Sequence, residues 1–110
     1  MTDKIVVLVT ANGVRQARKI ARALVEGKLA ACANVVSPVR SIYRWEGKIA
    51  EETECLMIIK TTRAHFDEVR ACVERLHSYS VPEVIALPIV DGAPNYLTWL
   101  AESTRAEALE

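Results

Sequence analysis

The sequence predicts an α+β domain of the ferredoxin-like type, with the element order βαββαβ and a short helix at its C-terminal end. Apolar runs of strand length alternate in that order with segments of helical periodicity. The two most apolar runs, 5–9 and 56–59, fall on the strands that this arrangement places side by side in the centre of the sheet, where both faces should be covered. With 110 residues, 51% of them apolar, the chain is predicted to form a single domain over residues 1–110.

Local signals predict where the helices and the last strand begin and end. Asn12 can cap the first helix, whose apolar residues recur at helical spacing, and Gly27 ends it. Thr62 can cap the second helix. Because Pro88 has no N–H to donate, the last strand is expected to lie at an edge of the sheet or to end there. Pro94 is expected at the first position of the terminal helix.

The second and third strands predict an unusually long hairpin. They run over about 31–45 and 48–61, and Glu46-Gly47 forms the turn between them. A strand over 31–45, at about 3.3 Å per residue, spans roughly 50 Å, whereas a domain of this length is roughly 34 Å across. The hairpin is therefore expected either to bend, with Pro38 as the place, or to protrude from the domain.

The same turn sets the pairing of the two strands. Trp45 should face Lys48, and the period of two places Tyr43 and Trp45 on one face of the ribbon. A two-stranded ribbon is marginally stable by itself, so we expect its aromatic side chains to be buried against another copy of the chain. The alternative is a ribbon that curls over its own sheet. For Tyr43 and Trp45 themselves, the first interpretation is interface anchors and the second is the wall of a cleft.

Charge and composition argue against several classes of function. Lys and Arg (14) balance Asp and Glu (14), whereas proteins that bind nucleic acid or membrane surfaces rely on a basic excess. No apolar stretch reaches the roughly 20 residues of a membrane span, and the first residues lack the apolar run of a signal peptide. Three cysteines without a CxxC pair are expected as thiols, so the predicted location is the cytoplasm.

The segment 77–83 joins the second helix to the last strand and carries an imidazole, a phenol and a carboxylate. His77 lies where a helix ends, so it is either a cap that bonds terminal carbonyls or a metal ligand or acid–base group. Tyr79 can bond a carbonyl or line a site, and Glu83 can form an ion pair or act as an acid or base. Because loops held by rigid elements often carry function, we predict a site here.

Other polar residues could extend this site. Lys60 ends a central strand, where a lysine either reaches solvent or holds an anion in a cleft. Cys32 begins the second strand and is either a small buried hydrophobe or a ligand for a soft metal at a subunit boundary. The hairpin carboxylates Glu51, Glu52 and Glu54 are expected to form solvated cross-strand pairs, and they could attract hard divalent ions weakly.

Five segments of the chain, considered together, resemble a known family. They are 28–34, 41–49, 59–61, 77–83 and 96–100. In this order they resemble the CutA (CutA1) divalent-cation-tolerance family over nearly the whole chain. The hairpin segment Ser-Ile-Tyr-Arg-Trp-Glu-Gly-Lys-Ile and the His-x-Tyr-x-x-Pro-Glu segment are the most specific of the five.

The resemblance implies a ferredoxin-like domain that assembles as a tight homotrimer by strand pairing between subunits. It also implies a cytoplasmic protein linked to tolerance of copper and other divalent metals, with a metal ion or small ligand as its partner and no organic cofactor. The family has no settled enzymatic reaction, so we predict a binding protein and not an enzyme. Some members carry a cysteine near the end of the first strand and a histidine pair at the end of the second helix, where this chain has Val9 and Leu76-His77.

The residues and the resemblance together predict a site at the subunit boundaries. The predicted ligand-binding cleft is lined by Lys60, Tyr79, Glu83, Tyr43 and Trp45. His77 and Cys32 are the predicted ligands of a metal, which would be copper or another divalent ion.

Two other functions remain open from the sequence. The family resembles the PII signalling proteins in architecture, which suggests a sensor that binds an anionic metabolite or nucleotide and depends on Lys60. A small enzyme that uses His77 or Glu83 as a general acid or base is the second alternative. The domain type decides neither, because ferredoxin-like domains carry many unrelated functions.

Overall fold

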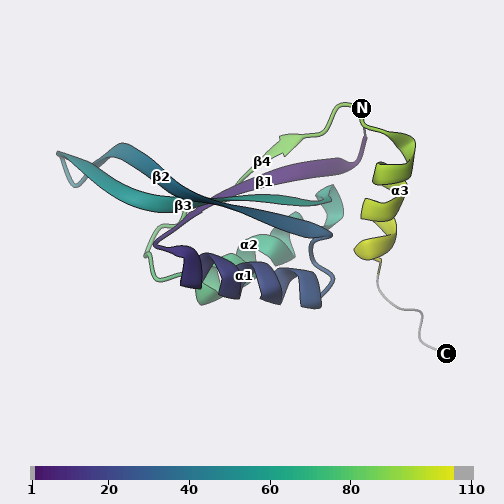
Figure 1. The fold of residues 1–110 in the computed structure, drawn as a ribbon, viewed down its shortest axis with the longest axis horizontal. Helices are drawn as coiled ribbons and strands as arrows, with labels where there is room; N and C mark the ends of the chain where they lie inside the picture. Colours follow the sequence, from purple (N-terminus) through teal and green to yellow (C-terminus); the bar gives the residue numbers. More distant parts are fainter. Residues whose placement is uncertain (1, 106–110) are drawn as a thin grey trace.

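The computed structural model describes residues 2–105, and the elements follow the predicted order (Figure 1). The strands are β1 (Lys4–Ala11), β2 (Cys32–Trp45), β3 (Lys48–Thr62) and β4 (Ile85–Pro88). The helices are α1 (Val14–Glu26), α2 (Phe66–Leu76) and α3 (Pro94–Ser103), and a 3₁₀ turn, η1 (Arg63–His65), precedes α2. The prediction of a mixed α+β domain is confirmed.

The four strands form one antiparallel sheet in the order β2-β3-β1-β4. This order places the two apolar strands β1 and β3 in the centre and β4 at an edge, as predicted, and it is that of the split βαβ arrangement. Helices α1 and α2 lie together on one face of the sheet, and α3 stands at one end of it (Figure 1).

The core lies between the sheet and the pair α1 and α2. Every second residue of β1 is buried, and Val7 and Val9 are fully covered. Met57 and Ile59 of β3 lie in the same layer and meet Leu24 of α1 within one cluster of buried residues. The expectation that the central strands are buried on both faces is wrong for a single chain, because α1 and α2 cover only one face.

The other face of the sheet, which we call the open sheet face, is apolar and partly exposed to solvent. The pairing of the four strands assigns to it seven apolar side chains, which are Val6, Leu8, Val36, Leu56, Ile58, Ile85 and Leu87. Leu87 of the edge strand is 50% exposed. Among the helices of residues 2–105, α3 reaches this face, where the Tyr96 hydroxyl lies 3.7 Å from the Cys32 sulfur.

The hairpin of β2 and β3 extends well beyond the helices (Figure 1). The longest dimension of the molecule is 51 Å, close to the length expected for the second strand alone. Trp45 pairs with Lys48 as predicted, and this register continues as far as Val39 opposite Glu54. Between Val36 and Val39 the register shifts by one residue, so the irregularity falls where Pro38 was expected to act.

The predicted helix caps are correct only in part. Gly27 ends α1 and Pro94 begins α3 as expected. Asn12 does not cap α1, because Gly13 occupies the N-cap position and no side chain bonds the first turn. The side chain of Thr62 likewise does not cap α2; its hydroxyl lies 2.6 Å from Nδ1 of His65.

Candidate functional site

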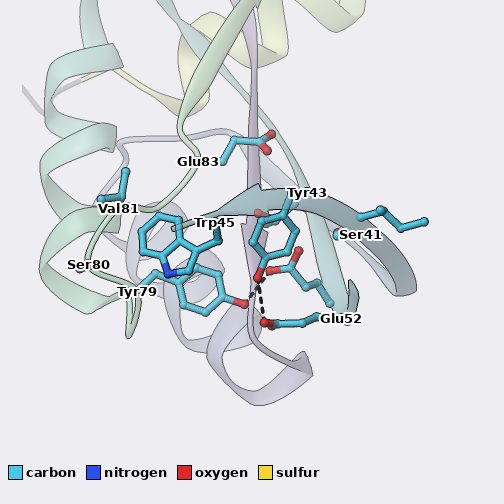
Figure 2. Close-up of a pocket in the computed structure, with 11 residues that line it drawn as sticks. Ser41, Tyr43, Trp45, Glu52, Tyr79, Ser80, Val81 and Glu83 are labelled. Atoms are coloured by element: carbon cyan, nitrogen blue, oxygen red, sulfur yellow. Dashed lines mark hydrogen bonds between the residues drawn. The ribbon is translucent and has the colours of Figure 1, made fainter. Parts of the chain in front are cut away.

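A pocket of about 620 Å³ lies between one face of the hairpin and the segment that follows α2 (Figure 2). Its volume is typical of sites for small organic ligands. The residues that line it are Thr10, Ser41, Ile42, Tyr43, Trp45, Glu52, Glu54, Tyr79, Ser80, Val81 and Glu83. We call this the hairpin pocket. Four residues predicted to line a cleft (Tyr43, Trp45, Tyr79 and Glu83) therefore do lie together.

The hairpin supplies one wall of the pocket because of its register. Ser41 pairs with Glu52, and the period of two brings Tyr43 and Trp45 to the same face as these residues. The Tyr43 hydroxyl donates a hydrogen bond to Oε1 of Glu52 over 2.8 Å. This bond orients a carboxylate at the pocket surface. Trp45, the last residue of β2, stays 47% exposed beside the turn.

The segment after α2 supplies the opposite wall. The Tyr79 hydroxyl donates a hydrogen bond of 2.6 Å to Oε2 of Glu54 on β3. Glu54 is only 5% exposed, so this bond satisfies a carboxylate that would otherwise be costly to bury. The pair ties the segment to the hairpin across 25 residues of sequence.

His77 holds this wall in place. One ring nitrogen, Nδ1, accepts a hydrogen bond of 3.0 Å from the backbone N–H of Tyr79. The other, Nε2, lies 2.7 Å from the carbonyl oxygen of Thr10, to which it must donate. Both bonds together require a neutral ring with its proton on Nε2. The rings of His77 and Tyr79 are also in contact, with centroids 4.5 Å apart.

Of the two predicted roles of His77, a cap that bonds carbonyls or a metal ligand, the structure of one chain is closer to the first. The carbonyl that His77 bonds belongs to strand β1, however, and not to the end of a helix. Both of its ring nitrogens are occupied, so a metal ion would have to displace one of these hydrogen bonds. Among residues 2–105, no group of three or more His, Cys, Asp or Glu side chains is arranged to hold a metal ion. The chain alone therefore contains no preformed metal centre in the part that the structure describes.

Lys60 and Cys32 do not join the hairpin pocket within one chain. They pair with each other across β2 and β3, six residues along β3 from Glu54, or roughly 20 Å. The Lys60 ammonium group donates to Oδ1 of Asn34. Cys32 lies beside Tyr96 and not beside His77, so the two predicted metal ligands are separated in a single chain.

The lining of the pocket is acidic. It includes the carboxylates of Glu52, Glu54 and Glu83 but no Lys, Arg or His side chain. Within residues 2–105, no basic side chain forms an ion pair with any of the three. Burial, the hydrogen bond to Glu54 and the charges of Glu54 and Glu52 all raise the pKa of Tyr79, in that order of size. The hydrogen bond to Glu52 is the main cause that raises the pKa of Tyr43.

Loss of the Tyr79 hydroxyl should change how stability depends on pH. Because the pKa of Tyr79 is higher in the folded chain than its ordinary value of 10.0, its contribution is complete below about pH 10 and is lost as the pH rises further. Tyr79→Phe should therefore flatten the fall in unfolding free energy above pH 10 and also lower stability at neutral pH by leaving Glu54 buried without its donor. Urea denaturation of both proteins from pH 7 to 11 measures this effect. An unchanged alkaline slope in the variant would contradict it.

The strand order and the long hairpin define the chain as a ferredoxin-like α+β domain. The family model for the CutA1 divalent ion tolerance protein matches residues 5–103, so the chain belongs to the CutA1 family. The Divalent-cation tolerance protein CutA of Thermus thermophilus is 50% identical over 99 residues, which cover 90% of this chain and 96% of that protein. Protein CutA, chloroplastic, of Arabidopsis thaliana is 46% identical over 101 residues, which cover 92% of this chain and 56% of that protein.

Solved structures agree with this assignment. The divalent cation tolerance protein Cut A1 of Thermus thermophilus superposes with a TM-score of 0.91 at 48% identity, covering 93% of this chain and 99% of that one. The periplasmic divalent cation tolerance protein CutA of Archaeoglobus fulgidus gives 0.90 at 41% identity, with the same coverage. Relatives are thus named both chloroplastic and periplasmic, so a cytoplasmic location stays a prediction. No helix within residues 2–105 is long and apolar enough to cross a membrane.

Proposed function

We propose that this chain acts in divalent-cation tolerance as a cytoplasmic homotrimer whose hairpin pocket binds a positively charged ligand. The observation that carries the proposal is the lining of the pocket, which has three carboxylates and no basic side chain. A cation that enters the pocket gains attraction from all three, whereas an anion is repelled. The ligand is a divalent metal ion or a small cationic molecule, and the role is binding rather than catalysis.

The open sheet face supports the trimer. It presents apolar side chains from all four strands, and the edge residues Ile85 and Leu87 are each 50% exposed. Large exposed apolar patches commonly mark interfaces between proteins. The protruding hairpin gives a second reason, since Ile42 and Ile49 near its tip are exposed as well. A neighbouring copy would cover the open sheet face and the face of the hairpin that carries Ile42 and Ile49, which is opposite to the face with Tyr43 and Trp45.

A charge on the open sheet face should dissociate the assembly. Leu87→Glu places a carboxylate in the apolar interface and should reduce the native mass from about three times the 12.2 kDa of one chain toward that of a monomer. Val25→Glu is the matched control, because it charges an exposed apolar residue on α1, on the opposite side of the sheet. Light scattering after size exclusion measures both. A wild-type monomer, or a trimeric Leu87→Glu variant, would contradict the assignment.

Titration of the purified chain tests the pocket. Calorimetry with metal chlorides and with small organic ammonium salts should show a saturable site for at least one cation, and Glu52→Gln should weaken that binding several-fold because it removes one charge without a change of shape. Glu51→Gln is the control, since Glu51 lies on the other face of the hairpin, bonded to Arg40. Binding of inorganic phosphate that Lys60→Ala abolishes would instead favour the anion-sensing alternative.

A further inference from the structure

We propose that the hairpin pocket is a site for a small organic cation, specifically a primary alkylammonium ion, held over aromatic rings and bonded by carboxylates. This inference rests on the proposed function and narrows its ligand class. It starts from the walls of the pocket: three aromatic side chains, Tyr43, Trp45 and Tyr79, surround the same space as the carboxylates (Figure 2). Aromatic faces together with carboxylates are the combination that recognises ammonium groups.

The two tyrosine hydroxyls fix the carboxylates without neutralising them. Glu52 receives the Tyr43 hydroxyl at Oε1, and Glu54 receives the Tyr79 hydroxyl at Oε2. Each carboxylate keeps a second oxygen that can accept a further hydrogen bond. An ammonium group donates up to three, so it can bond these oxygens while its alkyl chain lies against the rings. Glu83 lies on another side of the pocket, where it adds charge without crowding the site (Figure 2).

The same geometry is poorly suited to a bare metal ion. Hard divalent ions need several oxygen ligands that converge within about 2.0–2.6 Å of one point. No three acidic, His or Cys side chains among residues 2–105 converge in that way. The volume of about 620 Å³ also suits a molecule of several heavy atoms better than a single ion. An alkylammonium ion needs only two or three donor–acceptor contacts and an apolar wall, both of which the pocket has.

Trp45 is the residue whose position this ligand explains best. It is 47% exposed at the tip of a ribbon, although a large aromatic side chain gains most when it is covered. Trp99 of α3 is exposed to a similar extent, 44%, but its ring packs against Tyr96 with centroids 5.5 Å apart. Trp45 has no such ring partner among residues 2–105. A bound alkylammonium ion would cover its face.

Calorimetric titration with matched probes tests the proposal. The full chain, at low ionic strength, is titrated with n-butylammonium chloride, with the neutral isostere 1-butanol, and with calcium and zinc chlorides. n-Butylammonium should bind with one site per chain and at least about tenfold more tightly than 1-butanol. Tetramethylammonium, which has no N–H to donate, should bind more weakly than n-butylammonium because it engages the rings alone.

Variants locate the site. Trp45→Leu should weaken n-butylammonium binding about fivefold or more, while Trp99→Leu leaves it unchanged. Glu52→Gln should also weaken it, and Glu51→Gln should not. These substitutions lie on the surface, and thermal unfolding of each variant shows whether it is folded.

Three results would overturn the proposal, and they differ in what else they remove. Equal binding of 1-butanol would mean an apolar pocket without selection for charge. Binding of metal ions alone would leave the proposed cation site intact and exclude only the organic ligand. If no titrant binds, both the alkylammonium ligand and the proposed cation-binding function are overturned. That result is expected if a neighbouring copy fills the pocket.

Discussion

Ile59→Ala should lower the free energy of unfolding by about 2–5 kcal/mol, enough to leave a domain of this size close to unfolding. Ile59 is fully buried in the central strand β3, where it pairs with Val7 and Ala33 and packs in the layer under α1 and α2. Its truncation removes apolar contacts and leaves a cavity that the surrounding strands are unable to close. Urea denaturation followed by circular dichroism measures the loss.

The neighbouring Ile58→Ala makes this experiment informative about assembly. Ile58 points to the open sheet face and is only half-buried in a single chain. In a monomer its truncation should cost clearly less than that of Ile59. In the proposed trimer the two costs should be similar, and the loss for Ile58 should depend on protein concentration because dissociation is coupled to unfolding. A small loss at Ile59 would contradict the assignment of the core.

His77→Ala is expected to be the second most damaging change, and the damage should reach the pocket. The variant loses the partner of the Tyr79 N–H and of the Thr10 carbonyl at once, each worth about 1–3 kcal/mol if left buried without a partner. It also removes the ring against which Tyr79 packs, so Tyr79 should no longer be held against Glu54. We expect lower stability together with a changed tryptophan fluorescence, followed in a Trp99→Phe background so that the signal comes from Trp45 on the opposite wall.

A matched substitution separates this structural role from a metal-binding one. His65→Ala removes the other histidine, whose side chain bonds Thr62 at the end of β3, and it should cost less and leave the pocket intact. If His77 acts through structure, His77→Ala loses stability equally with and without added copper. If copper stabilises the wild type and not His77→Ala, and His77→Gln keeps the stability of the wild type without metal, the histidine is a ligand and our structural assignment is wrong.

Much of the fold could be predicted because local rules specify it. Alternation along the strands and the Glu46-Gly47 turn fixed the register, which in turn put Tyr43 and Trp45 on one face. The same turn also predicts that Ser41 pairs with Glu52, which places Glu52 on the face that carries Tyr43 and Trp45. Glu52 could therefore have been identified as a pocket residue from the sequence. The position of Asn12 was misjudged because a capping residue type does not determine which backbone position takes the cap conformation.

The site itself depends on contacts that no local rule specifies. Glu54 meets Tyr79 only after the sheet and α2 have packed. The third strand carries several glutamates, and nothing in the sequence indicates that Glu54 is the one that bonds Tyr79. The bond of His77 to Thr10 joins residues 67 positions apart. Lys60 was expected in the same cleft because it ends a strand, but it lies at the other end of the sheet from the hairpin tip. Distance along β3, rather than residue type, separates it from the pocket.

The register shift between Val36 and Val39 has a consequence for how this molecule can change in evolution. It divides the ribbon into an inner part, whose pairing is fixed by the core, and an outer part, whose pairing is fixed by the turn. Insertion of two residues into each strand next to the turn would lengthen the outer part, keep every side chain on its face and leave the inner part unchanged. Insertions and deletions can therefore change how far the hairpin of β2 and β3 extends without preventing the domain from folding.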